Sequence, residues 1–454
     1  MLATMLMVLL SLAGAAAPAA AQTEPTPTPT DPIWLAFSAA RAALEEKFSV
    51  NLSIVRRWDW NQAEFVNGID SCTTLENPLD ARQLYFGWRF LVTDVFGKQY
   101  EARTSFDRTI VVACNEVTVE AAGAAASPDG SLPTPVAGAA ATGAFELGGH
   151  VLELNTGTVN AMRSAGMTWV KSQHRFTLGQ DPSAVAGLIS SARANGFKIL
   201  LGVVGNTNQM GNFDDYINQY AQFVAGVAAQ GADAIEVWNE PNIDREWPAG
   251  TINGGNYTRL LAAAYNAIKG ANPNVLVISG APAPTGFFGA AGCTAQGCND
   301  DVFMQQMGQA GAGQYLDCVG LHYNEGIIPP SQQSGDPRGS YPTYYFNSML
   351  ARGYSPFGGK PVCWTELGYL TPEGFNDPLP STFAWAQDTS LAEHAAWLAD
   401  AASMSAQSGR VRLMIIWNVD FPFYTSTDPM GGYALIRPGG GCPACSTLGT
   451  VMSR

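Results

Sequence analysis

The sequence predicts an α/β fold, a (β/α)8 TIM barrel preceded by a small α+β domain. From Phe145 onward, short runs rich in β-branched residues alternate with helical patterns, which is typical of βαβ units and a parallel sheet. Eight such runs can be recognised, the number that a (β/α)8 barrel requires. A doubly wound sheet would carry a glycine fingerprint after its first strand, and FELGGHV offers only one Gly-Gly pair.

The composition limits the classes of partner. Of 454 residues, 46% are hydrophobic and 14% are charged, which suits a compact enzyme with at least one sizeable core. The 38 acidic and 24 basic residues give a formal net charge of -14. Because like charges repel, we expect no nucleic-acid partner and no attraction to anionic membrane surfaces.

Residues 1–21 form one apolar run that ends in three alanines, a small-residue pattern typical of a signal peptide. An N-terminal membrane anchor is the alternative. No later stretch approaches the ~20 apolar residues that a bilayer span needs, so we expect no membrane span in the mature protein. The expected location is secreted, extracellular or at the cell surface. Residues 22–30 form a Pro/Thr linker, expected to be extended.

Residues 31–118 predict a small α+β domain of unknown role. A helical pattern, IWLAFSAARAALEEKF, precedes strand-like runs that include LYFGWRFLVTDVF, KQYEART and RTIVVAC. The aromatic residues of this domain are either its core or a carbohydrate-binding surface: Trp58, Trp60, Tyr85, Trp88 and Phe90. An Ala/Gly/Pro-rich stretch, 119–144, predicts a second linker before the barrel domain, 145–454.

Export makes disulfides the expected state of the eight cysteines. Three pairs are plausible, namely Cys72–Cys114, Cys293–Cys298 and Cys442–Cys445. Cys318 and Cys363 remain, either as a fourth bridge or as two buried thiols on neighbouring strands. A zinc site at the CPAC sequence would need two further ligands, and none lies nearby at suitable spacing.

The predicted barrel strands and helices follow in alternation. The strands are FELGGHV (145–151), TWVKSQHRF (168–176), FKILLGVVG (197–205), AIEVWNEPN (234–242), VLVISGAPA (275–283), LDCVGLHYN (316–324), KPVCWTELG (360–368) and VRLMIIWNVDF (411–421). The helical patterns between them include 181–196, 213–231, 257–271 and 389–409.

Polar residues stand at the C-terminal ends of four predicted strands, the face on which such barrels carry their active sites. These ends are Trp238-Asn239-Glu240-Pro241-Asn242, His322-Tyr323-Asn324-Glu325, Trp364-Thr365-Glu366 and Trp417-Asn418-Val419-Asp420. Glycoside cleavage needs two carboxyl groups, one to protonate the leaving oxygen and one to attack or stabilise the developing oxocarbenium ion. Glu240 and Glu366 are the candidates for these two tasks.

The runs IEVWNEPN and WTELG resemble the acid/base and nucleophile motifs of clan A glycoside hydrolases. The closest resemblance is to family 39, the xylosidase and iduronidase type, and its relatives, and it covers roughly residues 145–440. It implies that Glu240 is the general acid/base, Glu366 the nucleophile, and Asn239 a partner of the sugar 2-hydroxyl. It also implies retention of configuration, with the two carboxyl groups about 5 to 5.5 Å apart.

Elementary electrostatics assign the same roles. A general acid near neutral pH needs a raised pKa, which apolar surface such as Trp238 would supply. A nucleophile must stay ionised, and hydrogen bonds from His322 or Tyr323 to Glu366 favour that state. The alternative is that both glutamates form salt bridges at the barrel rim.

Other strand ends supply further candidates for the sugar site. Arg175 either orients the nucleophile, as the clan's strand-two arginine does, or makes a surface ion pair. His150 either lines the sugar pocket or has a structural role. Trp417 is the best stacking platform by position, because sugar rings present apolar C–H faces to aromatic rings. Glu236 shares the side-chain parity of Glu240 and is interpreted as structural.

Several residues are expected to have little to do with the chemistry. His394 falls within a helical pattern, so a peripheral helix position is expected. Four aromatic residues either extend the cleft or pack in the core, namely Trp247, Tyr369, Phe421 and Tyr424. The long loop after strand six, 325–345, is expected to shape specificity.

The sequence therefore predicts a retaining hydrolase of O-glycosidic bonds, with β-linked bonds expected, that acts on poly- or oligosaccharide and needs no metal or organic cofactor. Two alternatives stay open. One is a barrel without catalysis that binds carbohydrate or serves a structural role at the cell surface. The other is a transglycosidase, which differs only in the acceptor that resolves the covalent intermediate.

Overall fold

The computed structural model describes residues 32–53, 55, 57–66, 68–72, 84–94, 98–117, 132–138, 143–286, 288–289, 291–425 and 427–453. The predicted signal peptide, the Pro/Thr linker and most of the second linker lie outside these residues. Within them, no helix is both long enough and apolar enough to cross a bilayer.

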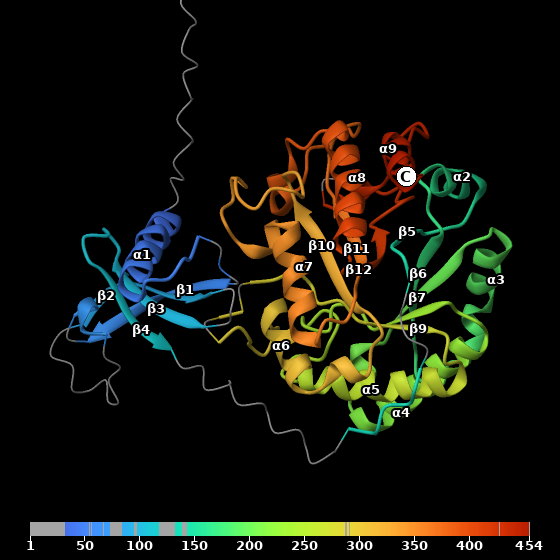
Figure 1. The fold of residues 1–454 in the computed structure, drawn as a ribbon, viewed down its shortest axis with the longest axis horizontal. Helices are drawn as coiled ribbons and strands as arrows, with labels where there is room; N and C mark the ends of the chain where they lie inside the picture. The colour runs from blue at the N-terminus through green and yellow to red at the C-terminus, as the bar shows by residue number, and fades with distance from the viewer. Residues whose placement is uncertain are drawn as a thin grey trace, which may run out of the picture.

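The small N-terminal domain packs one helix on one face of an antiparallel sheet (Figure 1). Its elements are α1 (Pro32–Phe48), β1 (Arg57–Val66), η1 (Ile69–Ser71), β2 (Leu84–Thr93), β3 (Gln99–Ser105) and β4 (Val111–Val117). The strands form a meander in the order β1-β2-β3-β4. The Cys72–Cys114 disulfide forms as predicted.

Aromatic residues build the core of this domain. The ring of Phe37 on α1 stacks on Trp58 at 4.0 Å between centroids, and Trp88 and Phe90 are buried beside them. Trp60 differs, because 43% of its surface is exposed. Most of the aromatic residues described here are therefore core.

Residues 132–138, within the predicted second linker, are extended and contact the barrel domain. Asn266 on α5 accepts a hydrogen bond from Val136 N at 2.8 Å and donates to Thr134 O at 3.0 Å. Leu132 packs against the barrel's hydrophobic core. This part of the linker is thus held along the barrel surface.

The C-terminal domain is a closed eight-stranded parallel barrel, which confirms the predicted fold. Its strands are β5 (Glu146–His150), β6 (Trp169–Arg175), β7 (Lys198–Val204), β8 (Ala234–Val237), β9 (Leu276–Ser279), β10 (Val319–Gly326), β11 (Val362–Tyr369) and β12 (Val411–Ile416). Neighbours in sequence are neighbours in the sheet, and β12 pairs with β5. A parallel bridge between Ile278 and Cys318 joins β9 to the start of β10 and closes the barrel.

Helices surround the strands, as Figure 1 shows. They are α2 (Thr156–Ser164), α3 (Ala186–Ala194), α4 (Phe213–Ala229), α5 (Gly254–Ala271), α6 (Asp300–Gln309), α7 (Phe346–Tyr354), α8 (Leu391–Ser408) and α9 (Pro443–Met452). Short 3-10 helices are η3 (Pro182–Val185), η4 (Thr207–Gln209), η5 (Ala312–Gln314), η6 (Pro342–Tyr344), η7 (Ser355–Phe357), η8 (Ser381–Ala386) and η9 (Met430–Tyr433).

Local signals explain where the long helices begin and end. Asn212 and Asn253 accept hydrogen bonds from backbone N–H groups at the starts of α4 and α5. Ser390 and Glu393 form a capping box at the start of α8, and Gly409 ends that helix in the left-handed conformation.

The floor of the barrel interior is apolar. Inward side chains from most strands form one cluster: Trp169, Leu200, Ala234, Ile278, Cys318, Cys363, Leu413 and Ile415. A fourth disulfide joins Cys318 to Cys363 within it, which resolves the alternative left open by the sequence. Gly148 leaves the space that this cluster needs, because a Cβ there would lie 2.7 Å from Ile415 Cδ1 and Trp169 Cβ.

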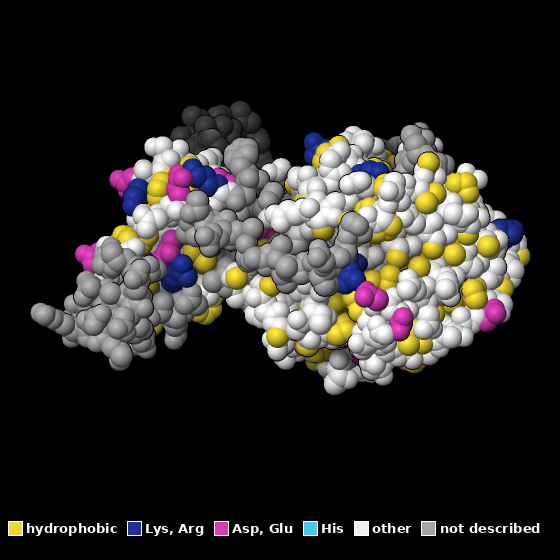
Figure 2. Space-filling view, turned by 90° about the horizontal axis from the view of Figure 1, so that it is seen from below, with side chains coloured by type: hydrophobic (Ala, Val, Ile, Leu, Met, Phe, Trp, Pro, Cys, Tyr) yellow, Lys and Arg dark blue, Asp and Glu magenta, His cyan; other side chains and the backbone are white. Residues whose placement is uncertain are grey.

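One outer face of the molecule is seen in Figure 2, from the side of α4 and α5. Lys, Arg, Asp and Glu side chains are scattered singly across this face, and apolar atoms form only small patches. Among the described residues on this face, Lys and Arg side chains do not gather into one patch.

Candidate active site

A sharp turn after β8 carries Asn239 and Glu240 to the C-terminal opening of the barrel. Trp238 and Glu240 both have positive φ, 78° and 45°, a conformation that costs a non-glycine residue about 1–3 kcal/mol. Backbone bonds stabilise it: Trp238 N donates to Val203 O at 3.0 Å and Glu240 N to Ala281 O at 2.9 Å. The turn therefore sends Trp238 outward among the helices and Glu240 toward the opening.

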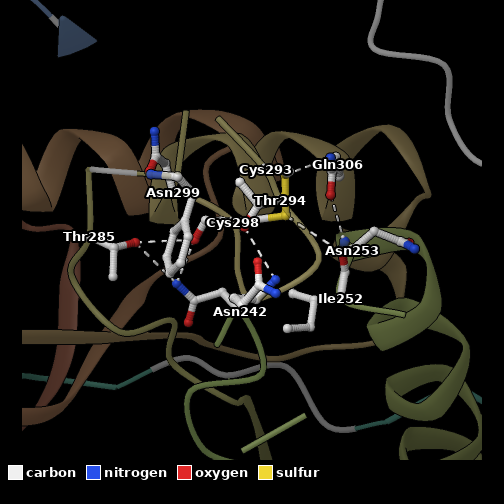
Figure 3. Close-up of a disulfide and its surroundings, with 12 residues drawn as sticks. Asn242, Ile252, Asn253, Thr285, Cys293, Thr294, Cys298, Asn299 and Gln306 are labelled. Atoms are coloured by element: carbon white, nitrogen blue, oxygen red, sulfur yellow. Dashed lines mark hydrogen bonds between the residues drawn. A yellow bond between two sulfur atoms is a disulfide. The ribbon is translucent and has the colours of Figure 1, made fainter. Parts of the chain in front are cut away.

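Asn242 ties this turn to the loops that follow β9 (Figure 3). Its amide donates to Ala283 O and Cys298 O, both at 3.0 Å, and its Oδ1 accepts from Ala283 N at 2.7 Å. The Cys293–Cys298 disulfide closes the loop that supplies Cys298. The last residue of the WNEPN motif is thus a structural anchor for Glu240.

Glu366 lies in β11 with its carboxylate at the opening and a buried cation beneath it. Lys171 Nζ is 3.5 Å from Glu366 Oε1, 2.8 Å from Glu236 Oε2, and donates to Thr365 O at 3.1 Å. Lys171 is fully buried, and so is Glu236. Burial alone would lower the pKa of Lys171, but the two carboxylates outweigh it and raise that pKa, so the lysine is charged.

His322 on β10 connects the two glutamates. Its Nδ1 is 3.2 Å from Glu240 Oε1, and its Nε2 is 3.9 Å from Glu366 Oε1. Burial opposes its charge, yet the charge of Glu366 and the hydrogen bond to Glu240 raise the pKa of His322. Both carboxylates therefore come within reach of one imidazolium ring.

Glu240 has a second cationic partner, Arg245, five residues further along the same loop. The Arg245 guanidinium bonds Glu240 Oε2, and the arginine side chain is 70% exposed. Burial favours the neutral carboxyl, but His322 and Arg245 outweigh it and lower the pKa of Glu240. The prediction that Trp238 raises this pKa is wrong, because Trp238 points away and its Nε1 donates to Glu246 O.

Buried polar atoms without a hydrogen-bond partner among the described residues gather at this opening. They come from the ends of four different strands: His150 Nδ1, Asn239 Oδ1, His322 Nε2, Asn324 Oδ1 and Asn418 Oδ1. Such atoms are costly unless something bonds them, so a polar ligand or water at these strand ends would satisfy them.

Trp417 and His150, at the ends of β12 and β5, lie against one another on one side of the opening. The two rings meet edge to face with centroids 4.7 Å apart, and Trp417 is only partly buried. Burial, together with the charges of Lys171 and His322, lowers the pKa of His150 well below its usual range. His150 is therefore neutral at physiological pH.

Tyr323 does not line the site. It is fully buried, its hydroxyl donates to Tyr344 O at 3.0 Å, and its ring packs against Phe346 and Trp364. Successive side chains of a strand point to opposite faces, so with His322 inside the barrel Tyr323 must face the helices. Its predicted role in binding substrate or Glu366 is wrong.

Arg175 does not reach Glu366 either. It donates to Gly205 O at 2.8 Å and pairs with Glu246 at 2.9 Å, which is the surface ion pair that the sequence left as the alternative. Lys171 lies four residues earlier on β6, about 13 Å back along the strand and so deeper in the barrel. That depth is what lets Lys171, and not Arg175, contact the nucleophile candidate.

Six further residues named in the sequence analysis lie away from the two glutamates or are only half-buried. Glu236 is structural as expected, paired with Lys171, and His394 is buried on α8 with Nε2 3.3 Å from Tyr433 O. Trp247 and Tyr369 are core residues. Phe421 and Tyr424 are half-buried in the loop after β12.

Sequence reasoning missed Lys171 and Arg245. A signal for Lys171 existed, because a charged residue within the apolar start of TWVKSQHRF shares the parity of Trp169 and must point inward. Arg245 lies in a loop, where sequence does not indicate side-chain direction. Within the part of the chain that the structure describes, no three His, Cys, Asp or Glu residues are grouped to hold a metal ion.

No family model matches the sequence, and no curated protein matches it. Among solved structures, the chain is similar to a family 39 glycoside hydrolase from Bacteroides cellulosilyticus WH2, with 15% identity, a TM-score of 0.49, and coverage of 89% of this chain and 78% of that one. It is also similar to an endo-1,4-beta-mannanase from Rhizomucor miehei, with 15% identity, a TM-score of 0.44, and coverage of 68% and 95%. An endo-beta-1,4-glucanase from Xanthomonas axonopodis pv. citri shares 14% identity, a TM-score of 0.44, and coverage of 68% and 99%.

Replacing Lys171 by Met should destabilise the barrel strongly. The change leaves Glu236 and Glu366 as buried carboxylates without their shared cation, a loss of about 3–5 kcal/mol in the free energy of unfolding. Urea denaturation followed by tryptophan fluorescence measures it. Lys198→Met is the matched control, because Lys198 pairs with Glu146 on the half-exposed surface and should cost only about 0–1 kcal/mol. Equal losses in the two variants would contradict the structural role of Lys171.

The chain has four histidines, so their ring titrations can be resolved by NMR. His394 should stay neutral until about pH 4, because burial and the charge of Arg437 lower its pKa to about 4. His322, with its raised pKa, should keep its proton above pH ~6.5, the ordinary value.

These titrations set opposite pH trends in stability. His394 takes up a proton at a higher pH in the unfolded chain than in the folded one. Its contribution to the free energy of unfolding is therefore lost as pH falls from about 6.5 to 4. The contribution of His322 is complete below pH ~6.5 and is lost as pH rises through its folded pKa. A His322→Gln variant should lack the alkaline decline, and an unchanged decline would rule out this assignment.

Proposed function

We propose that the barrel hydrolyses O-glycosidic bonds, β-linked, in extracellular poly- or oligosaccharides with retention of configuration. The observation that carries the proposal is that Glu240 and Glu366 lie within reach of one imidazole, that of His322, at the active-site face of the barrel. Two carboxyl groups bridged by one imidazole ring fit the acid/base and nucleophile pair of a double displacement. The four disulfides fit an oxidising compartment outside the cytoplasm.

In the first step Glu366 attacks the anomeric carbon while Glu240 gives its proton to the departing glycosidic oxygen. The C–O bond to the leaving group breaks and an ester forms between the sugar and Glu366. Lys171 and Asn324 hold the carboxylate of Glu366, the latter by a 3.4 Å bond to Oε2. They hold it in place and aimed at the opening.

In the second step Glu240, now a carboxylate, takes a proton from water, whose oxygen attacks the anomeric carbon and releases Glu366. His322 bonds Glu240 through Nδ1 and favours the charged form that this step needs. Two inversions at one carbon give net retention.

A sugar is the ligand that suits the opening. Its hydroxyl groups can donate to the unpartnered oxygens of Asn239, Asn324 and Asn418, and one apolar face of the ring can lie on Trp417. Asn239, next to Glu240, is the partner proposed for the 2-hydroxyl. We place these functions in the domain spanning 145–454 and assign no role to 31–118.

The two carboxyl groups can be tested together on a panel of aryl β-glycosides and polysaccharides. Glu366→Ala should abolish turnover, since no nucleophile remains, while Lys171 stays paired with Glu236 and the fold is kept. Glu240→Ala should lose about 10²–10⁴-fold on substrates with poor leaving groups and much less on activated ones, because a stable departing oxygen needs no proton. Initial rates with both substrate classes measure this.

Glu116→Ala, an exposed carboxylate of the small domain, is the control and should keep full activity. Full activity in Glu366→Ala would disprove its assignment as nucleophile, and equal losses on both substrate classes would disprove the role of Glu240. A wild-type chain that turns over no substrate in the panel would favour the non-catalytic barrel. Analysis of products for new glycosides separates hydrolysis from glycosyl transfer.

Arg245 should set the alkaline limit of activity. Glu240 must be protonated to act as an acid, so activity falls as pH rises through its pKa, and Arg245 and His322 keep that pKa low in the free enzyme. Arg245→Gln removes one of these cations and should move the basic limb of the kcat/KM profile to higher pH. Arg245→Lys keeps the charge and is the control. A basic limb unmoved in Arg245→Gln would exclude this coupling.

A further inference from the structure

We propose that a pocket beside the catalytic opening binds the neutral sugar residues of an oligosaccharide chain that extends away from the scissile bond. The pocket has a volume of about 550 Å³, within the range of about 300–1,000 Å³ found for ligand sites. It lies between the loops that follow β5 and β12. This inference rests on the proposed function, because the pocket adds a subsite to that opening.

The pocket is lined by the loops that carry on from the aromatic side of the opening. Val419 N donates to His150 O at 2.9 Å, so the loops after β12 and β5 leave the barrel side by side. Leu152 and Phe421, two residues further on each loop, are pocket-lining residues. A chain that leaves the ring of Trp417 in this direction enters the pocket.

A row of rings marks this path. The centroid of Trp417 is 6.3 Å from that of Phe421, which is 6.0 Å from that of Phe423. Phe423 is 63% exposed and Leu152 is 55% exposed, so large apolar side chains from both loops face solvent here. Apolar surface gathered at a pocket is typical of a ligand site.

The walls of the pocket are held firmly. Phe375 stacks on Tyr424 with centroids 3.8 Å apart, and the Arg437 guanidinium lies 4.7 Å from the Phe375 ring. Asp420 accepts hydrogen bonds from Leu152 N at 2.7 Å and Glu153 N at 3.0 Å. The pocket therefore does not depend on a ligand for its shape.

The charges favour a neutral ligand. Arg437 is the cation of the pocket, but it is buried and donates to the carbonyl oxygens of Gly432 at 3.1 Å and Thr371 at 3.3 Å. Glu153 and Asp420 supply two carboxyl groups. An acidic sugar would meet no free cation among the described lining residues, whereas neutral hydroxyl groups find acceptors.

The test compares the full chain with its Phe421→Ala variant on 4-nitrophenyl β-glycosides that carry one to four β-1,4-linked glucose, mannose or xylose residues. We expect the ratio of kcat/KM for the four-residue substrate to that for the one-residue substrate to fall about tenfold in the variant, which corresponds to ~1.4 kcal/mol. A loss by the same factor at every length, or no loss at any length, overturns the proposal.

Measuring oligosaccharide binding tests the proposed pocket independently of turnover. Calorimetry with cellotetraose, mannotetraose and xylotetraose should show binding of at least one to the wild type and a loss in Phe421→Ala. Phe106→Ala, which removes a 43% exposed phenylalanine from the small domain, is the matched control. No binding to the wild type, or a loss in Phe106→Ala instead, overturns the pocket. Binding without hydrolysis leaves the pocket standing while the proposed function fails.

Discussion

The arrangement of the opening depends on one buried cation, Lys171, between Glu236 and Glu366. Below it lies the apolar floor of the barrel, and above it lies the polar opening, so the lysine marks the level at which the interior changes character. A buried ammonium group is stable only when carboxylates compensate it, and removal of one partner leaves a charge with no solvent. Glu366 is consequently held from beneath by a charge that cannot move away.

The other charged groups continue this pairing of cations with carboxylates toward the opening. Lys171, Arg245 and protonated His322 stand against Glu236, Glu240 and Glu366, three cations against three carboxylates. The two ends differ in mobility, because Lys171 is enclosed and Arg245 is mostly exposed. The enclosed cation lies beside the proposed nucleophile, which must keep its position, and the exposed cation lies beside the proposed acid, which must exchange a proton.

The fold and the two glutamates could be predicted because they leave short-range signals. Strand and helix periods alternate from Phe145 onward, and two glutamates follow tryptophans at strand ends. The predictions that failed concerned how deep a side chain lies in the barrel and which way it points. His322 faces inward and Tyr323 outward, as plain alternation along β10 from Cys318 requires. In β11 one extra residue separates Trp364, which pairs with Leu321, from Glu366, which pairs with His322, so the inward direction of Glu366 does not follow from alternation. Such an irregularity leaves no mark in the sequence.

Trp238 shows how strongly local backbone conformation controls the site. In a regular strand Trp238 and Glu240 would point the same way, and the indole would line the opening. The left-handed conformation at both positions breaks that relation, so the tryptophan enters the helix layer while the glutamate meets His322 and Arg245. The hydrogen bonds of Asn242 offset the cost of these two backbone conformations, because its buried amide joins three segments around the turn. The acidity of Glu240 therefore follows from the turn geometry and not from the tryptophan two residues before it.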